Sequence, residues 1–163
     1  MDIIGKSPVP IVVLIIGKTA FLFCALFFVV KSLSPETMLY DGVVTRVVGI
    51  VLNALGGMIA IVSLVQLGQS TAVGFPERGT ELKTHGLYRF SRNPIYLGGF
   101  IVCVGSCFYS IHPVNFVLCA IAIGIHLRIV RKEEEFLKKR FGQRWLDYKQ
   151  QVPRFVRIPS HTT

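Results

Sequence analysis

Charged side chains and histidine are nearly absent from three long stretches of the sequence. Residues 8–30 contain only Lys18, residues 43–68 contain only Arg46, and residues 94–125 contain only His112. Each stretch is at least as long as the roughly 20 apolar residues that cross the hydrocarbon core of a bilayer. An ordinary soluble domain is therefore excluded. The sequence predicts an integral membrane protein whose 163 residues form one domain.

Three further absences narrow the possible functions. The first apolar stretch follows Asp2 instead of a basic region and has no clear small-residue cleavage site, so we expect no cleavable signal peptide. The four cysteines, at positions 24, 103, 107 and 119, include no C-x-x-C pair, so we expect buried structural cysteines and no metal site. No glycine-rich turn between a strand and a helix precedes an acidic residue, so a Rossmann-type cofactor site is not supported.

The apolar stretches divide into four predicted helices. Ser110, His112 and Pro113 belong to a cluster of residue types that interrupt helices, and this cluster splits the third stretch in two. We expect spanning helices at about residues 9–31, 43–67, 94–109 and 113–131, which makes the fold class all-α with four transmembrane helices.

The polar segments at residues 69–93 and 131–159 would lie outside the membrane. The fourth helix should continue to about Arg140 and end near Gly142. A short amphipathic helix then follows, with Trp145 and Tyr148 on one face. This helix is expected to lie on lipid headgroups or to fold over the loop as a lid.

Basic residues are concentrated in the two polar segments. Four lie between residues 69 and 93 and ten lie between residues 128 and 157, which is fourteen of the eighteen in the chain. Four spanning helices place both segments on one side of the membrane. The positive-inside rule makes that side cytoplasmic, together with both termini. A basic surface next to membrane helices favours anionic lipid headgroups over nucleic acid as a partner.

Two polar clusters border the apolar helices and are the candidates for a ligand site. The first, residues 85–98, carries arginines, tyrosines, an asparagine and a proline; the second, residues 128–135, carries arginines and three consecutive glutamates. Either cluster alone also suits interfacial lipid anchors or a solvated helix surface. A cationic and aromatic cluster facing a carboxylate cluster would instead form a polar ligand site.

The same residues resemble a known family. The run YRFSRNPIYLG at residues 88–98, followed by Glu133-Glu134, Leu137, Phe141-Gly142, Trp145, Tyr148 and Val152-Pro153-Arg154, resembles the isoprenylcysteine carboxyl methyltransferase and phospholipid methyltransferase superfamily. The resemblance covers about residues 80–159. It implies an integral membrane enzyme that methylates a lipidic or membrane-soluble acceptor with S-adenosylmethionine.

The resemblance also implies which positions contact the cofactor. These are Thr80, Glu81, Leu82, Lys83, Tyr88, Asn93, Pro94, Ile95, Tyr96 and Glu133. Asn93 stands where many members have histidine, and Trp145 replaces a common tyrosine. Ile129 stands where some members have an arginine that binds the acceptor, so Arg128 and Arg131, which flank it, are the candidates for that role.

The chemistry of the cofactor suits the remaining residues. Arg89 or Arg92 would pair with its carboxylate. Glu133 would accept hydrogen bonds from its amino group or ribose, and Tyr88 and Tyr96 offer aromatic faces to the adenine or the sulfonium. Methyl transfer asks mainly for alignment. An acceptor amine or thiol would also need a base, for which Glu134 and Tyr148 are the candidates. Trp145 and Arg154 complete the expected acceptor site.

The sequence therefore predicts a membrane-bound S-adenosylmethionine-dependent methyltransferase, most like the isoprenylcysteine carboxyl O-methyltransferases. A phospholipid amine, a small thiol or a hydrophobic metabolite are alternative acceptors. A non-catalytic four-helix membrane scaffold or transporter subunit is the alternative from another class of protein.

Overall fold

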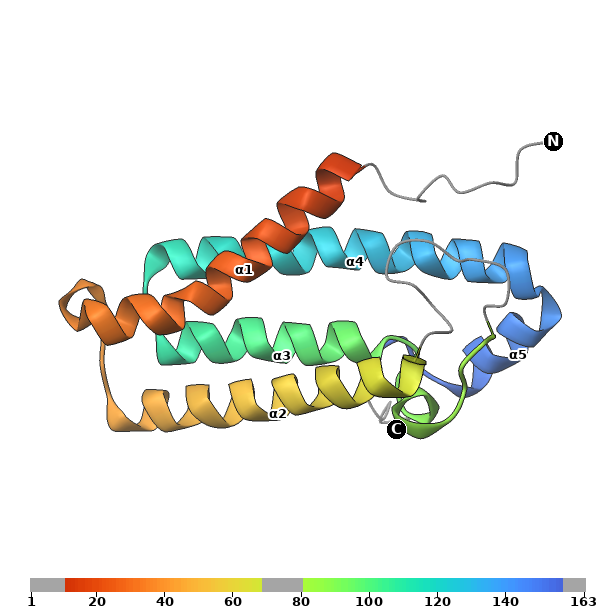
Figure 1. Ribbon diagram of the computed structural model, residues 1–163, viewed down its shortest axis with the longest axis horizontal. Coiled ribbons are helices and arrows are strands. Elements are labelled where there is room, and N and C mark those ends of the chain that lie inside the picture. The colour runs from red at the N-terminus through yellow and green to blue at the C-terminus, as the bar shows by residue number, and fades with distance from the viewer. Residues whose placement is uncertain (1–10, 69–80, 157–163) are drawn as a thin grey trace, which may run out of the picture.

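The structure, a computed structural model, describes residues 11–68 and 81–156, and these form an α-helical bundle (Figure 1). Its helices are α1 (Ile11–Leu33), α2 (Val43–Leu67), α3 (Pro94–Tyr109), α4 (Pro113–Phe141) and α5 (Gln143–Gln151). Two short 3-10 turns, η1 (Pro35–Thr37) and η3 (Gly86–Arg89), lie in the connections. The described ranges contain no strand, so the expected all-α class is confirmed.

The ends of the helices follow from local sequence. Prolines occupy the first turns of α3 and α4, where a missing N–H leaves no helical hydrogen bond unmade. The Nδ1 atom of His112 caps α4 by accepting a hydrogen bond of 3.2 Å from the backbone N–H of Val114. Helix α4 ends at Phe141, next to Gly142, as the sequence predicts.

Two helices of the described chain, α2 and α4, are long and apolar enough to cross a membrane. Helix α3 has only 16 residues, which corresponds to about 24 Å at 1.5 Å per residue, and it is shorter than a bilayer core. Helix α1 has 23 residues. That all four helices span the membrane stays a prediction.

Glycines bring α2 and α3 into close contact along their length (Figure 1). A Cβ atom on Gly56 would lie 2.6 Å from the carbonyl oxygen of Gly98, and one on Gly98 would lie 2.6 Å from that of Gly56. At Gly49 the added atom would meet the backbone of Tyr109 at 2.6 Å. Small residues at helix interfaces are the usual packing device in lipid, and here they fix α3 against α2.

Helix α1 packs against α4, which it crosses obliquely in Figure 1, and it also contacts α3. These contacts again depend on glycine. A Cβ atom on Gly17 would lie 2.8 Å from Ile125 of α4, and one on Gly99 would lie 3.1 Å from the ring of Phe21. The Lys18 side chain, which the sequence leaves without an evident partner, is exposed on the outside of α1.

A buried lysine ties the helix ends together at the end of the bundle that holds η1. The Nζ atom of Lys31 donates a hydrogen bond of 2.6 Å to the carbonyl oxygen of Tyr109 and pairs with Asp41 at 2.6 Å. Arg46 pairs with the same carboxylate at 2.7 Å. These contacts join the ends of α1 and α3 to the start of α2.

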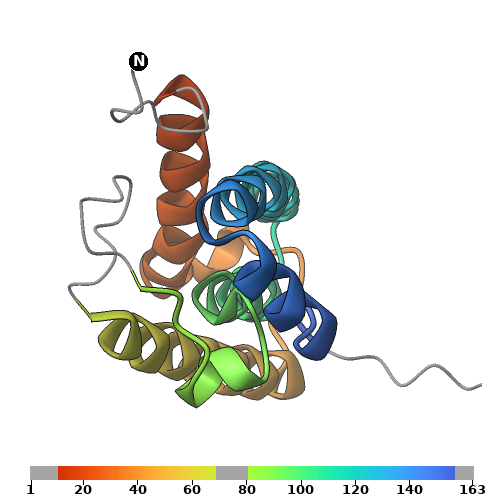
Figure 2. The same cartoon turned by 90° about the vertical axis from the view of Figure 1, so that its right-hand side faces the viewer.

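Residues 81–93 and helix α5 close the opposite end of the bundle, which is seen end-on in Figure 2. The turn η3 packs on α2, and α5 packs on the extension of α4. Both polar clusters of the sequence therefore meet at one end of the bundle.

Replacing Gly56 with alanine should test the close approach of α2 and α3. The added methyl group would press on the backbone of α3, so we expect the free energy of unfolding to fall by about 1–3 kcal/mol. The matched control is Gly57→Ala, because nothing lies within 4 Å of a Cβ atom there and alanine favours the helix by about 1 kcal/mol. Unfolding in detergent micelles measures both. Equal stability of the two variants would contradict this packing.

Candidate functional site

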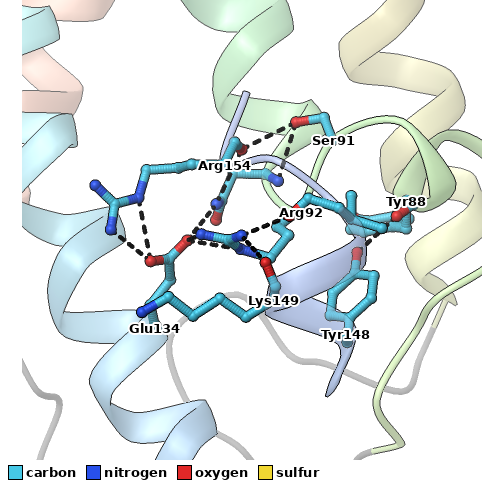
Figure 3. Close-up of polar contacts among 9 residues, drawn as sticks. Tyr88, Ser91, Arg92, Glu134, Tyr148, Lys149 and Arg154 are labelled. Atoms are coloured by element: carbon cyan, nitrogen blue, oxygen red, sulfur yellow. Dashed lines mark hydrogen bonds and ion pairs between the residues drawn. The ribbon is translucent and has the colours of Figure 1, made fainter. Parts of the chain in front are cut away.

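The Glu134 carboxylate is the centre of the polar cluster (Figure 3). Its Oε1 atom accepts hydrogen bonds from Arg92 Nε at 3.2 Å, Arg92 Nη2 at 3.0 Å and Asn93 Nδ2 at 3.1 Å. Its Oε2 atom accepts from Arg154 Nε at 3.1 Å and Arg154 Nη2 at 2.6 Å. Two guanidinium groups and one amide therefore surround a carboxylate that is only 7% exposed.

The arginines set the charge of this carboxylate. Glu134 lies beyond the apolar part of α4. Burial acts to raise the pKa of its carboxyl group, but the hydrogen bonds and charges of Arg154 and Arg92 outweigh burial and hold the pKa below its ordinary value of 4.5. The same bonds raise the pKa of Arg154. Glu134 is thus an anion at neutral pH that is fully engaged by its neighbours.

Arg92 connects this cluster to the C-terminal segment through hydrogen bonds. Its Nη1 atom donates to the carbonyl oxygens of Val152 at 2.5 Å and Lys149 at 3.1 Å, and its backbone N–H donates to that of Pro153 at 2.9 Å. The guanidinium also lies over the ring of Trp145, 5.7 Å from its centroid. One side chain therefore links the loop before α3, the extension of α4 and the end of α5.

Helix α5 buries its aromatic face against the loop. Trp145, Tyr148 and Val152 are 2%, 7% and 8% exposed, and they pack with Leu82, Leu137 and Phe141. The hydroxyl group of Tyr148 donates a hydrogen bond of 2.6 Å to the carbonyl oxygen of Tyr88. Of the two expected placements of this helix, on headgroups or over the loop, the structure has the second.

Burial also changes the two tyrosines at this contact. It raises the pKa of Tyr88 to about 12, with a smaller effect from the Glu133 carboxyl, and it raises the pKa of Tyr148 as well. The hydroxyl of Tyr88 reaches the carbonyl oxygen of Ser63 on α2 at 3.4 Å. Both phenols therefore stay protonated at neutral pH and act as hydrogen-bond donors.

Glu133 lies beside Glu134 but has a different environment. Its Oε1 atom accepts a hydrogen bond of 2.8 Å from the hydroxyl of Tyr96 on α3. Burial raises the pKa of Glu133, and the bond from Tyr96 offsets part of this effect. Within the described residues its Oε2 atom has no hydrogen-bond partner. Glu133 is therefore the carboxylate that has an oxygen available for a ligand.

The other predicted residues divide into those that join the cluster and those that do not. Asn93 and Pro94 are buried within it, and Leu82 packs on α5. Glu81 is exposed, and its carboxylate lies 3.7 Å from Lys83. Ile95, on the first turn of α3, is half-buried. Thr80 lies outside the described residues.

The other predicted arginines pair with neither glutamate within the described chain. Arg128 and Arg131 are exposed on α4 and make no ion pair within the described chain, and Arg89 is exposed on η3. Arg89 lines an open hollow of about 460 Å³ between the loop and α5, together with Thr84, Asp147, Tyr148, Gln151 and Val152. Neither Glu133 nor Tyr96 lines this hollow.

Several contacts of the cluster carry no signal in the sequence. Gln66, at the end of α2, accepts a hydrogen bond of 2.8 Å from the backbone N–H of Leu87, and Gly86 turns there with a φ of 64°. Ser91 donates to the carbonyl oxygen of Arg154 at 3.1 Å. A backbone carbonyl has no sequence signature, and an apolar helix ending in glutamine is unremarkable. Only the folded chain assigns these contacts.

Comparison with known proteins identifies the family. The phospholipid methyltransferase family model matches residues 44–144, which is more than half of the chain. The chain belongs to this family. The match covers α2, α3 and α4 and extends to the start of α5, and it therefore includes both polar clusters.

Relatives of this family member carry a more specific name. It is 28% identical over 109 residues to protein-S-isoprenylcysteine O-methyltransferase B of Arabidopsis thaliana, a match that covers 64% of this chain and 55% of the plant protein. It is 36% identical over 73 residues to the protein-S-isoprenylcysteine O-methyltransferase of Mus musculus, covering 44% of this chain and 26% of that protein. The chain thus spans about half the length of the plant relative.

Removing the charge of Glu134 should destabilise this family member. Glu134→Gln leaves the buried guanidinium of Arg92 without its counter-ion, so we expect the free energy of unfolding to fall by about 3 kcal/mol. The matched control is Glu135→Gln, whose carboxylate pairs with Lys132 at 3.0 Å on the exposed face of the same helix. Chemical unfolding in micelles at neutral pH measures both. An equal effect of the two changes would contradict a structural role for Glu134.

The stability of the same two variants should also respond differently to low pH. Because the pKa of Glu134 is lower in the folded than in the unfolded protein, its stabilising contribution is complete above the ordinary value of 4.5 and is lost as the pH falls through the folded pKa. Below pH 4.5 the free energy of unfolding of the wild-type protein and of Glu135→Gln should therefore fall further than that of Glu134→Gln, which has no such charge to lose.

Proposed function

We propose that this protein transfers a methyl group from S-adenosylmethionine to a hydrophobic acceptor that is dissolved in the membrane. Membership of the phospholipid methyltransferase family and the names of its relatives support the methyltransferase chemistry. The apolar helices α2 and α4 support a membrane location. Both termini and the polar end of the bundle would face the cytoplasm, because most basic residues belong to the polar segments.

The hydrogen bond between Tyr96 and Glu133 is the observation that carries this proposal. It joins the two polar clusters across α3 and α4 at 2.8 Å, and no described residue binds the second oxygen of Glu133. Burial raises the pKa of this carboxyl, and a cationic ligand would favour its charged form and pair with it. The cofactor carries an amino group and a sulfonium, and therefore Glu133 and Tyr96 fit it.

The loop supplies the remaining cofactor contacts. Arg89 and Lys83 are the cations available for the cofactor carboxylate, since Arg92 is already engaged by Glu134. Thr80, Glu81 and Leu82 complete this stretch, and Tyr88, Asn93, Pro94 and Ile95 shape the backbone between it and α3. The cofactor supplies the methyl group, and these residues bind and orient it.

Glu134, Arg92, Arg154 and Tyr148 act in this proposal as positioning residues. A carboxylate with five hydrogen bonds and a lowered pKa is a poor proton acceptor, and a phenol that already donates to a carbonyl is a poor base. Their contacts instead fix the loop and α5 around the site and exclude water. Trp145 contributes to that cover, while Arg128 and Arg131 are left to contact lipid headgroups or the acceptor.

The acceptor is open to several chemistries. The relatives' names make an isoprenylcysteine carboxylate the first acceptor to test, and an amine-bearing phospholipid or a hydrophobic thiol are the next. A non-catalytic membrane scaffold with the same fold would bind no cofactor. Binding of S-adenosylmethionine therefore separates the enzyme from the scaffold before any acceptor is known.

Calorimetry on the purified protein in detergent should show S-adenosylmethionine binding with a micromolar dissociation constant, about −8 kcal/mol. Glu133→Gln should weaken it about tenfold or more, because a charge-assisted hydrogen bond contributes about 1.5–3 kcal/mol. Glu135→Gln, on the exposed face, should have little effect. No binding by the wild-type protein would refute the proposed function, and equal affinities of the two variants would refute the role of Glu133.

A further inference from the structure

His126 lies on the same face of α4 as Glu133, two helical turns earlier and about 10 Å away along the axis. The sequence of α4 from Pro113 to Ile125 contains no acidic, basic or histidine residue, so His126 is the first such side chain met from the apolar start of the helix. Ionisable side chains at such depth are costly and usually functional. None of the contacts described above for the cofactor site uses this ring.

Three helices converge on the ring of His126. The ring of Tyr96 on α3 lies 5.8 Å from it and that of Phe21 on α1 lies 6.1 Å from it, centroid to centroid. A Cβ atom on Gly17 of α1 would lie 3.3 Å from its Cε1 atom. Tyr96 also bonds Glu133, so it stands between the imidazole and the carboxylate that is proposed to hold the cofactor.

The hydrogen bond at Nδ1 fixes the tautomer of this histidine. Nδ1 lies 2.7 Å from the carbonyl oxygen of Ala122. A carbonyl oxygen can only accept, so Nδ1 carries the proton, and Nε2 of the neutral ring is an acceptor. Over residues 11–68 and 81–156, Nε2 has no hydrogen-bond partner. The ring, which lies beside residues of α1 and α3, therefore has a basic nitrogen that no described residue binds.

The other candidate bases at this end of the bundle are occupied. Glu134 is held by two arginines and Tyr148 donates to a backbone carbonyl. The nearby cations Arg128 and Arg131 are exposed, and at about 100° per residue they lie on other faces of α4 than His126. The described residues thus place a proton acceptor, His126, and a carboxylate, Glu133, on either side of Tyr96, and within the described chain neither has an arginine or lysine partner that could also pair with an anionic acceptor.

We infer that His126 is the residue that accepts the proton of the methyl acceptor, and that the acceptor is a hydrophobic molecule whose nucleophilic atom bears a proton, an amine or a thiol. This inference rests on the proposed function. The nucleophilic atom bonds to the methyl carbon while the electron pair of the broken carbon–sulfur bond stays on sulfur. The acceptor's proton moves to Nε2, and the imidazolium later releases it to water. The positive charge passes from the sulfonium to the ring, beside the face of Tyr96.

The test uses the full-length protein in lipid nanodiscs with radiolabelled S-adenosylmethionine. One prenyl chain is ended in an amine, a thiol or a carboxylate, so that only the nucleophile differs. We expect transfer to the amine or the thiol. His126→Gln keeps a hydrogen-bond acceptor but cannot take a proton, so kcat should fall about a hundredfold or more while KM changes little. His126→Phe keeps the ring packing and should lose kcat equally.

The matched control is His112→Asn, which removes a histidine at the opposite end of α4 and keeps an N-cap acceptor. It should have wild-type kinetics. A second readout needs no turnover: in protein labelled at histidine nitrogens, the prenyl amine should shift the His126 signals and leave those of His112 unchanged. Calorimetry should show that all three variants bind S-adenosylmethionine as the wild type does.

Two results would overturn the inference and leave the proposed function standing. One is transfer to the carboxylate but to neither the amine nor the thiol. The other is transfer to the amine or thiol with kcat of His126→Gln within about twofold of wild type, well short of the hundredfold loss expected for a lost base. Failure of the proposed function itself is distinct, because the wild-type protein would then bind no S-adenosylmethionine and methylate none of the three chains.

Discussion

The polar end of this protein depends on one carboxylate held between two guanidinium groups. Glu134 belongs to α4, Arg92 to the loop before α3, and Arg154 to the segment after α5, so three stretches far apart in sequence share one ion cluster. Removing two charges from water is costly, and the bonds must be well made to compensate. Five hydrogen bonds to one carboxylate meet that demand and hold the loop and α5 in register with the helices.

The two adjacent glutamates have opposite environments and therefore different roles in the site. Glu134 is saturated by arginines and has a lowered pKa, while Glu133, among the described residues, is bonded only by Tyr96 and has a raised pKa. Consecutive residues on a helix point about 100° apart, so α4 turns one toward the loop and the other toward α3. A structural anion and a ligand-binding carboxylate therefore lie next to each other without competing for the same partners.

The sequence predicted the helices well because their signals are local. Long apolar stretches, prolines at first turns and the glycine after Phe141 placed the four long helices within about two residues at most ends, with α4 extended as expected. The aromatic face of α5 was visible in the spacing of Trp145 and Tyr148. Packing roles were harder to assign: Gly56 and Gly57 are neighbours, and only the first touches α3, because a helix buries one face at a time.

The sequence by itself determined the membrane-helix composition, the family resemblance and the pair of polar clusters that make up the site. It could not tell which glutamate is bound by arginine, that Gln66 caps the turn at Leu87, or that His126 faces Tyr96. Those facts depend on how α1, α3 and α4 are rotated against one another, and rotation is set by close packing between distant residues. Motifs name the chemical groups, and tertiary contacts decide which groups are engaged and which remain available.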